Sequence, residues 1–173
     1  MIFNNRSTLK FLLFVIFSIG NFSACNYSFT GASVPAHLTS IAIPISEDRS
    51  GYGEPGLGNS FTDELIKKFT DDNTLRVTDR SGADAILECT ITSMNDSPTV
   101  ITGGETVNKR RITITVHAVY KDLVKRTTVF DKNFSDYGDY DSTQDVVTGR
   151  ETAITDAVDK ITEDILLGVV SNW

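Results

Sequence analysis

The chain has 173 residues, of which 40% are hydrophobic and 23% charged, and its formal net charge is −7. This composition is typical of a globular chain, and the length favours one domain. The acidic balance argues against a nucleic-acid-binding surface, which needs a basic footprint. The two cysteines, Cys25 and Cys89, are too few for a disulfide framework or an all-cysteine zinc site.

The N-terminal segment has the features of a secretory signal. Arg6 and Lys10 precede an apolar run over residues 11–19, and small residues follow at Ser23-Ala24. The run is too short to cross a bilayer, which takes about 20 apolar residues. We therefore expect residues 1–24 to be removed as a signal peptide rather than to form a buried helix.

Cys25 follows these small residues in an arrangement similar to a bacterial lipobox, although Phe22 stands where leucine is usual. In a lipobox the cysteine becomes the acylated first residue of the mature protein. Each buried methylene contributes about 0.8 kcal/mol, so two or more chains, palmitate among them, give a stable anchor. We expect lipidation of Cys25, a lead-in over residues 25–38 and a single domain over residues 39–173. A secreted chain without lipid is the alternative.

The domain is expected to begin with a strand, a loop and a helix. The strand covers residues 40–45, and Pro44 restricts it to a sheet edge or to its last rungs. Residues 47–58 are rich in glycine and charge and indicate a loop. From about Pro55 to Asp72 apolar residues recur every four positions, which predicts an amphipathic helix. The recurring positions are Leu57, Phe61, Leu65 and Phe69.

Strands dominate the middle of the chain. A short strand is expected over residues 75–78, and longer ones over residues 85–92, 112–120 and about 127–134. Apolar and polar residues alternate in the second and third of these, as in half-buried strands. Cys89 falls on an apolar face, which suits a lone thiol in an oxidising compartment.

A turn over residues 136–141 is expected to precede a long C-terminal helix. Ser142 and Asp145 have capping-box spacing at its start. The apolar stripe of this helix consists of Val147, Ile154, Val158, Ile161 and Ile165.

These elements predict an α+β fold. We expect a two-layer sandwich in which two amphipathic helices pack on one face of a mixed, mostly antiparallel sheet of four to five strands. The outer sheet face would meet water or a polar partner, and it carries Thr90, Thr92, Thr113 and Thr115.

Two motifs match ligand-binding patterns but fit turns better. Residues 51–56 match G-x-G-x-x-G, yet no second crossover helix separates the later strands, as a dinucleotide fold requires. The aspartates within residues 136–141 depart from the spacing of a calcium loop. His37 and His117 lie far apart, and no nucleophile or zinc motif is present. We expect no enzyme activity, no cofactor and no metal site.

One cationic cluster stands out in this acidic chain. Lys109, Arg110 and Arg111 lie where the loop over residues 97–106 enters the longest strand, and Lys109 and Arg111 share its outer face. Such a cluster could hold phosphates or a partner's carboxylates, or it could be a solvated strand start. Val100 and Ile101 in the loop suit contact with an amphiphile or a protein, unless they fold back over the sheet edge.

Several segments together resemble the LptE family of lipopolysaccharide-assembly lipoproteins, in the form found in Bacteroidetes-type bacteria. They are the lipobox with Asn26–Phe29, Ile41–Pro44, Asp48–Ser50, Glu54–Leu57 and Phe134–Asp141. The resemblance implies an outer-membrane lipoprotein on the periplasmic side, with two helices on a β-sheet. It further implies that the protein plugs the LptD β-barrel, supports its assembly and binds lipopolysaccharide. Lys109, Arg110 and Arg111 are candidates for that contact by location.

A second resemblance leads to a different partner. Residues 41–69 are also similar to the strand–loop–helix opening of curli-secretion-type lipoproteins and of the N-terminal domain of TolB. This alternative describes an assembly factor of another envelope secretion complex. A carrier of amphiphiles acting alone would need a deep apolar cavity, which a two-layer sandwich with filled helix stripes hardly leaves.

Overall fold

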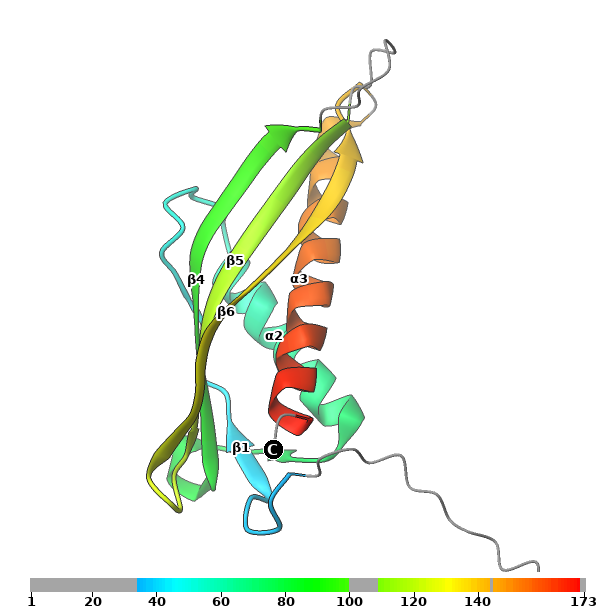
Figure 1. The fold of residues 1–173 in the computed structure, drawn as a ribbon. Coiled ribbons are helices and arrows are strands. Elements are labelled where there is room, and N and C mark those ends of the chain that lie inside the picture. Colours follow the sequence, from blue (N-terminus) through cyan, green and yellow to red (C-terminus); the bar gives the residue numbers. More distant parts are fainter. Residues whose placement is uncertain (1–33, 100–108, 144, 172–173) are drawn as a thin grey trace, which may run out of the picture. The chain divides into compact units, whose positions relative to one another are not determined.

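A computed structural model describes residues 34–99, 109–143 and 145–171. The expected signal peptide, the lipidation site Cys25 and the loop residues Val100 and Ile101 lie outside these ranges. The elements of the described chain (Figure 1) are, in order, β1 (Ser40–Ala42), β2 (Glu47–Asp48), α2 (Leu57–Asp72), β3 (Arg76–Val77), a 3₁₀ turn (Arg80–Gly82), β4 (Ala85–Pro98), β5 (Lys109–Asp122), β6 (Thr127–Asp141) and α3 (Val146–Val170).

The described strands form one mixed sheet with both helices on the same face (Figure 1). The strand order is β3-β1-β4-β5-β6, and β2 pairs with β4 outside this path. The β1, β2 and β3 pairings are parallel, whereas β4, β5 and β6 form an antiparallel meander. The predicted α+β sandwich is therefore confirmed, but the described residues form six strands, because the two-residue β2 lies in the expected loop and is too short to leave a periodic signal.

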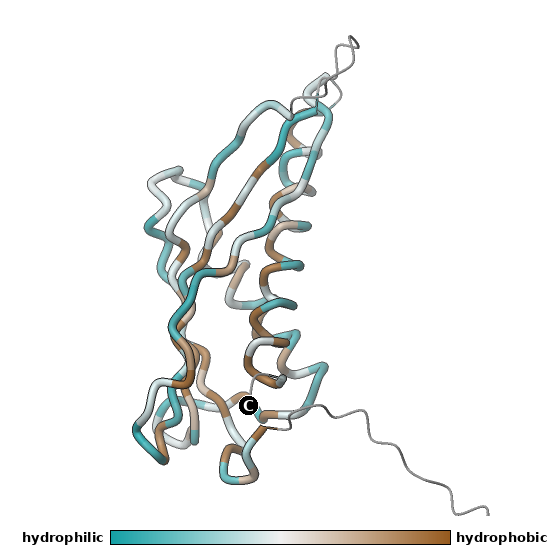
Figure 2. Tube along the Cα trace, viewed as in Figure 1, coloured by the Kyte–Doolittle hydropathy of each residue, from teal (hydrophilic) through white to brown (hydrophobic). Residues whose placement is uncertain are grey.

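The core lies between the sheet and the helices. Apolar residues of β4 and β5 face each other in register, with Leu87 opposite Tyr120 and Cys89 opposite Ala118. A bulge between Ile91 and Ser93 shifts the alternation by one residue, so that Met94 is buried again. The hydrophobic stretches of strands and helices meet in this layer (Figure 2). Cys89 is buried there as a free thiol, as predicted.

Helix α2 has the predicted buried face but begins slightly later than expected. Leu57, Phe61, Leu65 and Phe69 are all buried. Gly56 takes the N-cap position with a left-handed φ of 76°, so Pro55 precedes the helix. Gly51 and Gly53 also have positive φ, which fits the interpretation of residues 51–56 as turns.

Helix α3 begins at a different cap from the predicted one. Asp145 is the N-cap, and its carboxylate accepts a hydrogen bond from the backbone N–H of Thr148. Val147 is 69% exposed and does not belong to the buried stripe. Val158, Ile161 and Ile165 are buried as expected.

The turn expected over residues 136–141 is instead the last part of β6. These residues pair with Ile114 to Lys109 of β5 in unbroken register. Gly138 belongs to this part, and a Cβ there would overlap backbone atoms of Ala153 in α3. Glycine thus serves close strand–helix packing here, where the sequence alone suggested a turn.

The lead-in is fastened to the sheet at the other end of the strands. Asp84 Oδ2 accepts hydrogen bonds from the backbone N–H and hydroxyl groups of Thr39 and Ser40, at 2.8–3.1 Å. His37 Nε2 lies 2.6 Å from Oδ2 of the buried Asp122. Side chains of the sheet therefore hold the chain where it enters the domain.

Candidate functional site

The cationic cluster at the start of β5 lies beside the end of β6. Lys109 is opposite Asp141, Arg110 opposite Tyr140, and Arg111 opposite Asp139. Because side chains alternate along a strand, neighbouring cations point to opposite faces of the sheet. The structure thus places Lys109 and Arg111 on the outer face, as predicted, and Arg110 on the helix-covered face.

Arg110 is held in a polar network on the helix-covered face. Its Nε donates to Asp96 Oδ1 at 2.9 Å and to the Tyr140 hydroxyl at 3.1 Å, and that hydroxyl donates to Asp96 Oδ2 at 2.8 Å. The Asp96 side chain is only 9% exposed. Hydrogen bonding to Asp96 raises the pKa of Arg110, and burial raises the pKa of Tyr140. This network joins the ends of β4, β5 and β6.

Arg111 and Lys109 differ in how far they are neutralised. Arg111 binds Asp139 through two hydrogen bonds of 2.7 and 2.9 Å, and its guanidinium lies 3.4 Å from the centroid of the Tyr137 ring. The bond from Arg111 lowers the pKa of Asp139. Among the described residues, the exposed Lys109 ammonium has no ion pair. Lys109 therefore offers uncompensated positive charge on the outer face, and beside it Arg111, whose charge Asp139 balances, keeps 34% of its side chain exposed.

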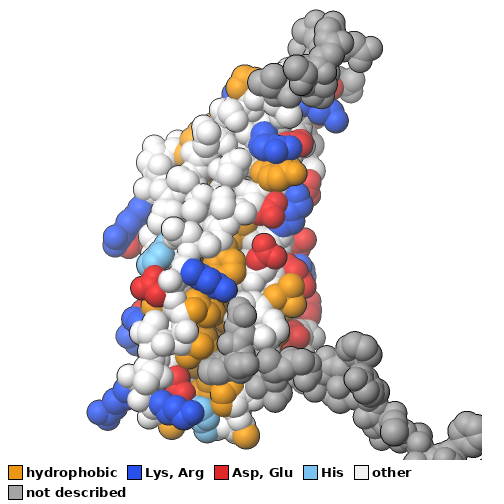
Figure 3. Space-filling view, viewed as in Figure 1, with side chains coloured by type: hydrophobic (Ala, Val, Ile, Leu, Met, Phe, Trp, Pro, Cys, Tyr) orange, Lys and Arg blue, Asp and Glu red, His pale blue; other side chains and the backbone are white. Residues whose placement is uncertain are grey.

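The rest of the outer sheet face is polar and balanced in charge. Thr115 and Ser135 share a hydrogen bond across β5 and β6. His117 pairs with Asp131 at 2.7 Å, and Lys121 pairs with Glu88 at 2.6 Å. In Figure 3 white surface, which marks the backbone and side chains that are neither charged nor hydrophobic, covers much of the strands. Among the described residues of this face, Tyr137 is the large hydrophobic side chain that is exposed, at 39%.

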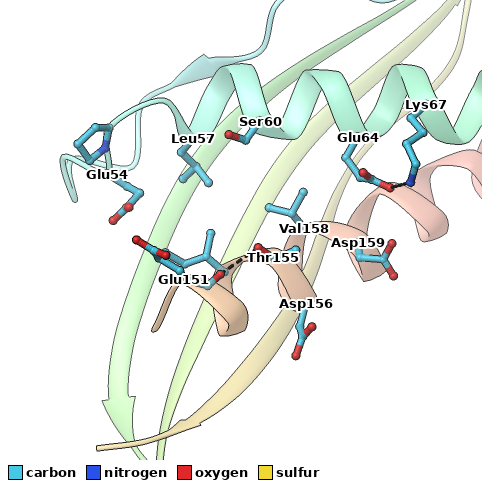
Figure 4. Close-up of a pocket in the computed structure, with 12 residues that line it drawn as sticks. Glu54, Leu57, Ser60, Glu64, Lys67, Glu151, Thr155, Asp156, Val158 and Asp159 are labelled. Atoms are coloured by element: carbon cyan, nitrogen blue, oxygen red, sulfur yellow. Dashed lines mark hydrogen bonds and ion pairs between the residues drawn. The ribbon is translucent and has the colours of Figure 1, made fainter. Parts of the chain in front are cut away.

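Sequence reasoning missed a groove between α2 and α3, which we call the helix groove. Its volume is about 560 Å³, and Leu57, Ile154 and Val158 form its apolar floor. Carboxylates from both helices and the preceding loop surround this floor (Figure 4). They belong to Glu54, Glu64, Glu151, Asp156 and Asp159.

Nearby cations neutralise only part of this acidic rim. Arg150 binds Glu54 at 2.6 Å, and Lys67 binds Glu64 at 2.9 Å. Lys68, at the side of the groove, binds Asp159 at 2.8 Å. The acids of α3 recur at helical spacing, which was the available sequence signal. The groove also requires a gap between α2 and α3. This gap depends on tertiary packing, and the sequence contains no pattern that predicts it.

Other candidate chemistries have little support in the described residues. Burial raises the pKa of the Cys89 thiol to about 12, so this cysteine is a poor nucleophile. The described part of the chain contains no group of acidic, histidine or cysteine side chains arranged to hold a metal ion. None of its helices combines the length and apolar character needed to span a membrane.

Comparison with known proteins identifies a family over most of the chain. The model of the LptE family, described as lipopolysaccharide-assembly, matches residues 38–167. A comparison with curated protein sequences finds no match. The family match favours the first resemblance over the curli-secretion or TolB alternative.

Solved structures share the fold at low sequence identity. A hypothetical protein from Chlamydia trachomatis has a TM-score of 0.57 and 9% identity, with 76% of this chain and 95% of that chain covered. A protein from Xanthomonas campestris has a TM-score of 0.56 and 14% identity, with coverage of 79% and 88%. An uncharacterized lipoprotein B from Nitrosomonas europaea has a TM-score of 0.51 and 12% identity, with coverage of 80% and 84%. These similarities show the fold alone.

Proposed function

The chain belongs to the lipopolysaccharide-assembly family LptE, whose model matches residues 38–167, and from this membership we propose that it is a lipid-anchored partner of an LptD-type outer-membrane β-barrel. In this proposal Cys25 carries the lipid, the domain faces the periplasm, and it supports the barrel as a plug. The role is one of assembly rather than catalysis. The family match over most of the domain is the observation that carries the proposal.

Co-purification tests the partnership. The lipidated protein is extracted from envelopes with mild detergent, purified, and analysed with its associated proteins by mass spectrometry. We expect a large outer-membrane β-barrel of the LptD type in stoichiometric amount. Recovery of another secretion complex without such a barrel would contradict the proposal. It would favour the alternative of a curli-secretion-type assembly factor.

We further propose that the cations at the start of β5 contact the phosphates of lipopolysaccharide. Lys109 and Arg111 support this role because they present charge on one face, and Val100 and Ile101 of the preceding loop are the proposed apolar contacts. Arg110 instead points to the helix-covered face, where its guanidinium binds Asp96 and Tyr140. Its proposed contribution is therefore smaller, and comes through holding the strand ends together.

A charge-matched pair of variants tests the phosphate contact. Removing both cations in Lys109→Ala/Arg111→Ala should raise the dissociation constant for lipid A at low salt by about tenfold, or about 1.4 kcal/mol. The difference should shrink with added salt because exposed charges are screened. The control Lys125→Ala/Arg126→Ala removes the same charge from the opposite end of the sheet, beyond Asp122. Equal binding by both variants would contradict the assignment.

A further inference from the structure

The helix groove is a second interaction surface, separate from the cations at the start of β5. Its floor consists of Leu57, Val158 and Ile154, and the half-buried Ile154 supplies most of the accessible apolar surface because Leu57 and Val158 are only 3% and 5% exposed. Figure 4 shows Glu54 and Glu151 at one end of the groove, with Thr155 between the floor and the rim. Its volume of about 560 Å³ lies within the range of about 300–1,000 Å³ that is usual for ligand-binding clefts.

The rim keeps an excess of negative charge after its internal ion pairs are counted. Glu54, Glu64 and Asp159 have cationic partners within 3 Å. Glu151 and Asp156 are exposed, and among the described residues their carboxylates have no partner. The uncompensated charge favours a cationic occupant.

With residues 1–24, which carry Arg6 and Lys10, removed as the expected signal peptide, the chain itself does not offer such an occupant. Between Cys25 and the C-terminus, the residues outside the described ranges contain neither lysine nor arginine. These residues are 26–33, 100–108, 144 and 172–173. A second copy would bring another net charge of −7 towards the rim. Charge complementarity therefore points to a different molecule.

We propose that the helix groove binds a basic segment of a partner protein, which places an apolar side chain on the floor and lysine or arginine side chains against Glu151 and Asp156. The apolar floor explains why a cation alone is a poor fit, because desolvating apolar surface favours a partner with its own apolar group. The aliphatic stems of lysine and arginine also cover apolar surface while their charged ends reach the rim. This inference does not depend on the proposed partnership with a β-barrel.

A random heptapeptide display library, selected against the purified full chain, tests the chemistry of the occupant. We expect enriched peptides with an apolar residue flanked by lysine or arginine. The strongest peptide is then titrated against the Glu151→Gln/Asp156→Asn variant, where its dissociation constant should rise about tenfold. Replacing the apolar residue of the peptide by serine should weaken binding by a similar factor.

A matched variant separates the groove from general acidity. Asp63→Asn/Asp164→Asn removes two exposed carboxylates from the same helices outside the groove, and it should bind the peptide like wild type. Selected peptides without cationic residues, or equal loss in both variants, would overturn the proposal. Spermidine that displaces the peptide with equal affinity would also overturn it, in favour of a small polycation. Dimers of the purified chain whose stability changes in the Glu151→Gln/Asp156→Asn variant would show that two chains pair through this face. That result would also overturn the proposal.

Discussion

Asp84 holds the start of the domain through hydrogen bonds from Thr39 and Ser40. Hydrogen bonds from the hydroxyl and backbone N–H of Thr39, and from those of Ser40, lower its pKa to about 2. A carboxylate with a lower pKa in the folded state than in the unfolded chain stabilises the fold above its unfolded pKa of about 3.9. That stability is lost as the pH falls from about 4 to about 2.

We therefore predict that Asp84→Asn lowers the melting temperature at pH 6 and flattens its dependence on pH between about 4 and 2. Urea or thermal unfolding monitored by circular dichroism across this range measures both effects. Asp63→Asn, which changes an exposed acid on α2, should keep the wild-type slope. A slope that Asp84→Asn leaves unchanged would show that this carboxylate does not control acid stability.

The residues at 109–111 show how far the sequence determines a site. Strict alternation correctly separated Arg110 from Lys109 and Arg111, because neighbouring residues in a strand point to opposite faces. It did not identify Asp96 and Tyr140 as the partners of Arg110. Those partners depend on the register of three strands, which includes the bulge between Ile91 and Ser93.

At the scale of elements, the contact between β6 and α3 depends on one glycine. A Cβ at Gly138 would lie 2.7 Å from Cα of Ala153, and the obstructing atoms belong to the helix backbone. Gly138→Ala should therefore destabilise the domain by about 1–3 kcal/mol. Urea unfolding measures this change in the free energy of unfolding.

Gly149 provides the matched control for this packing prediction. A Cβ there meets Cβ of Tyr140 at 3.5 Å, which is ordinary contact, and alanine favours the helix by up to about 1 kcal/mol over glycine. Gly149→Ala should thus leave stability unchanged or raise it. Equal destabilisation by both substitutions would mean that α3 does not lie against β6 as described.

The buried stripe of α3 leads to a second prediction for this element. Ile161 is fully buried in the core, so Ile161→Asp places an unpaired charge there and should cost about 3–5 kcal/mol. That is a large share of the roughly 5–15 kcal/mol that stabilises a domain. Thermal unfolding should show a melting temperature lowered by many degrees or no cooperative transition.

Leu167→Asp makes the same chemical change on the exposed side of α3, where Leu167 is 48% exposed. Its effect should stay within about 0.5 kcal/mol. Similar melting temperatures for the two variants would contradict the assigned helix face.

Periodicity predicted the elements well where one face is buried over several turns or rungs. Such patterns are the four apolar positions of α2 and the alternation of apolar and polar residues in β4 and β5. It failed over residues 136–141, where aspartates, tyrosines and glycine resemble a turn. These residues form a strand because Arg110 and Arg111 of β5 bind side chains there and because Gly138 admits the helix.

At the scale of the whole molecule, the helix groove illustrates what a single sequence cannot supply. Its acids recur at helical spacing in the sequence of α3. Because solvated acids on a helix are common, this spacing alone does not indicate a binding site. The acids form a candidate binding surface only in the folded structure, where α2 lies beside α3 and apolar side chains lie between the two helices. Acidic side chains are visible along the α3 side in Figure 3. On the outer sheet face, by contrast, His117 and Lys121 pair with acids, and the exposed Lys109 has no ion pair among the described residues. The two faces therefore suit partners of different chemistry.

The proposed anchor gives the prediction that concerns the whole molecule. No described helix is suited to span a bilayer, so membrane attachment in our proposal depends on acyl chains at Cys25. Because each buried methylene contributes about 0.8 kcal/mol, losing all acyl chains removes the hydrophobic attachment to the bilayer. In cells depleted of the proposed barrel partner, Cys25→Ala should therefore shift the protein from the membrane pellet to the soluble fraction after a high-salt wash.

Cys89→Ala is the matched control, because it also removes a thiol but from a buried site whose raised pKa disfavours reaction. This variant should remain in the membrane pellet, and mass spectrometry of its N-terminal peptide should show acyl chains on Cys25. The salt wash matters because it screens attraction between surface charges and lipid headgroups while leaving the hydrophobic anchor intact. Retention of Cys25→Ala under these conditions would contradict the lipid anchor, whereas loss of both variants would implicate folding rather than lipidation.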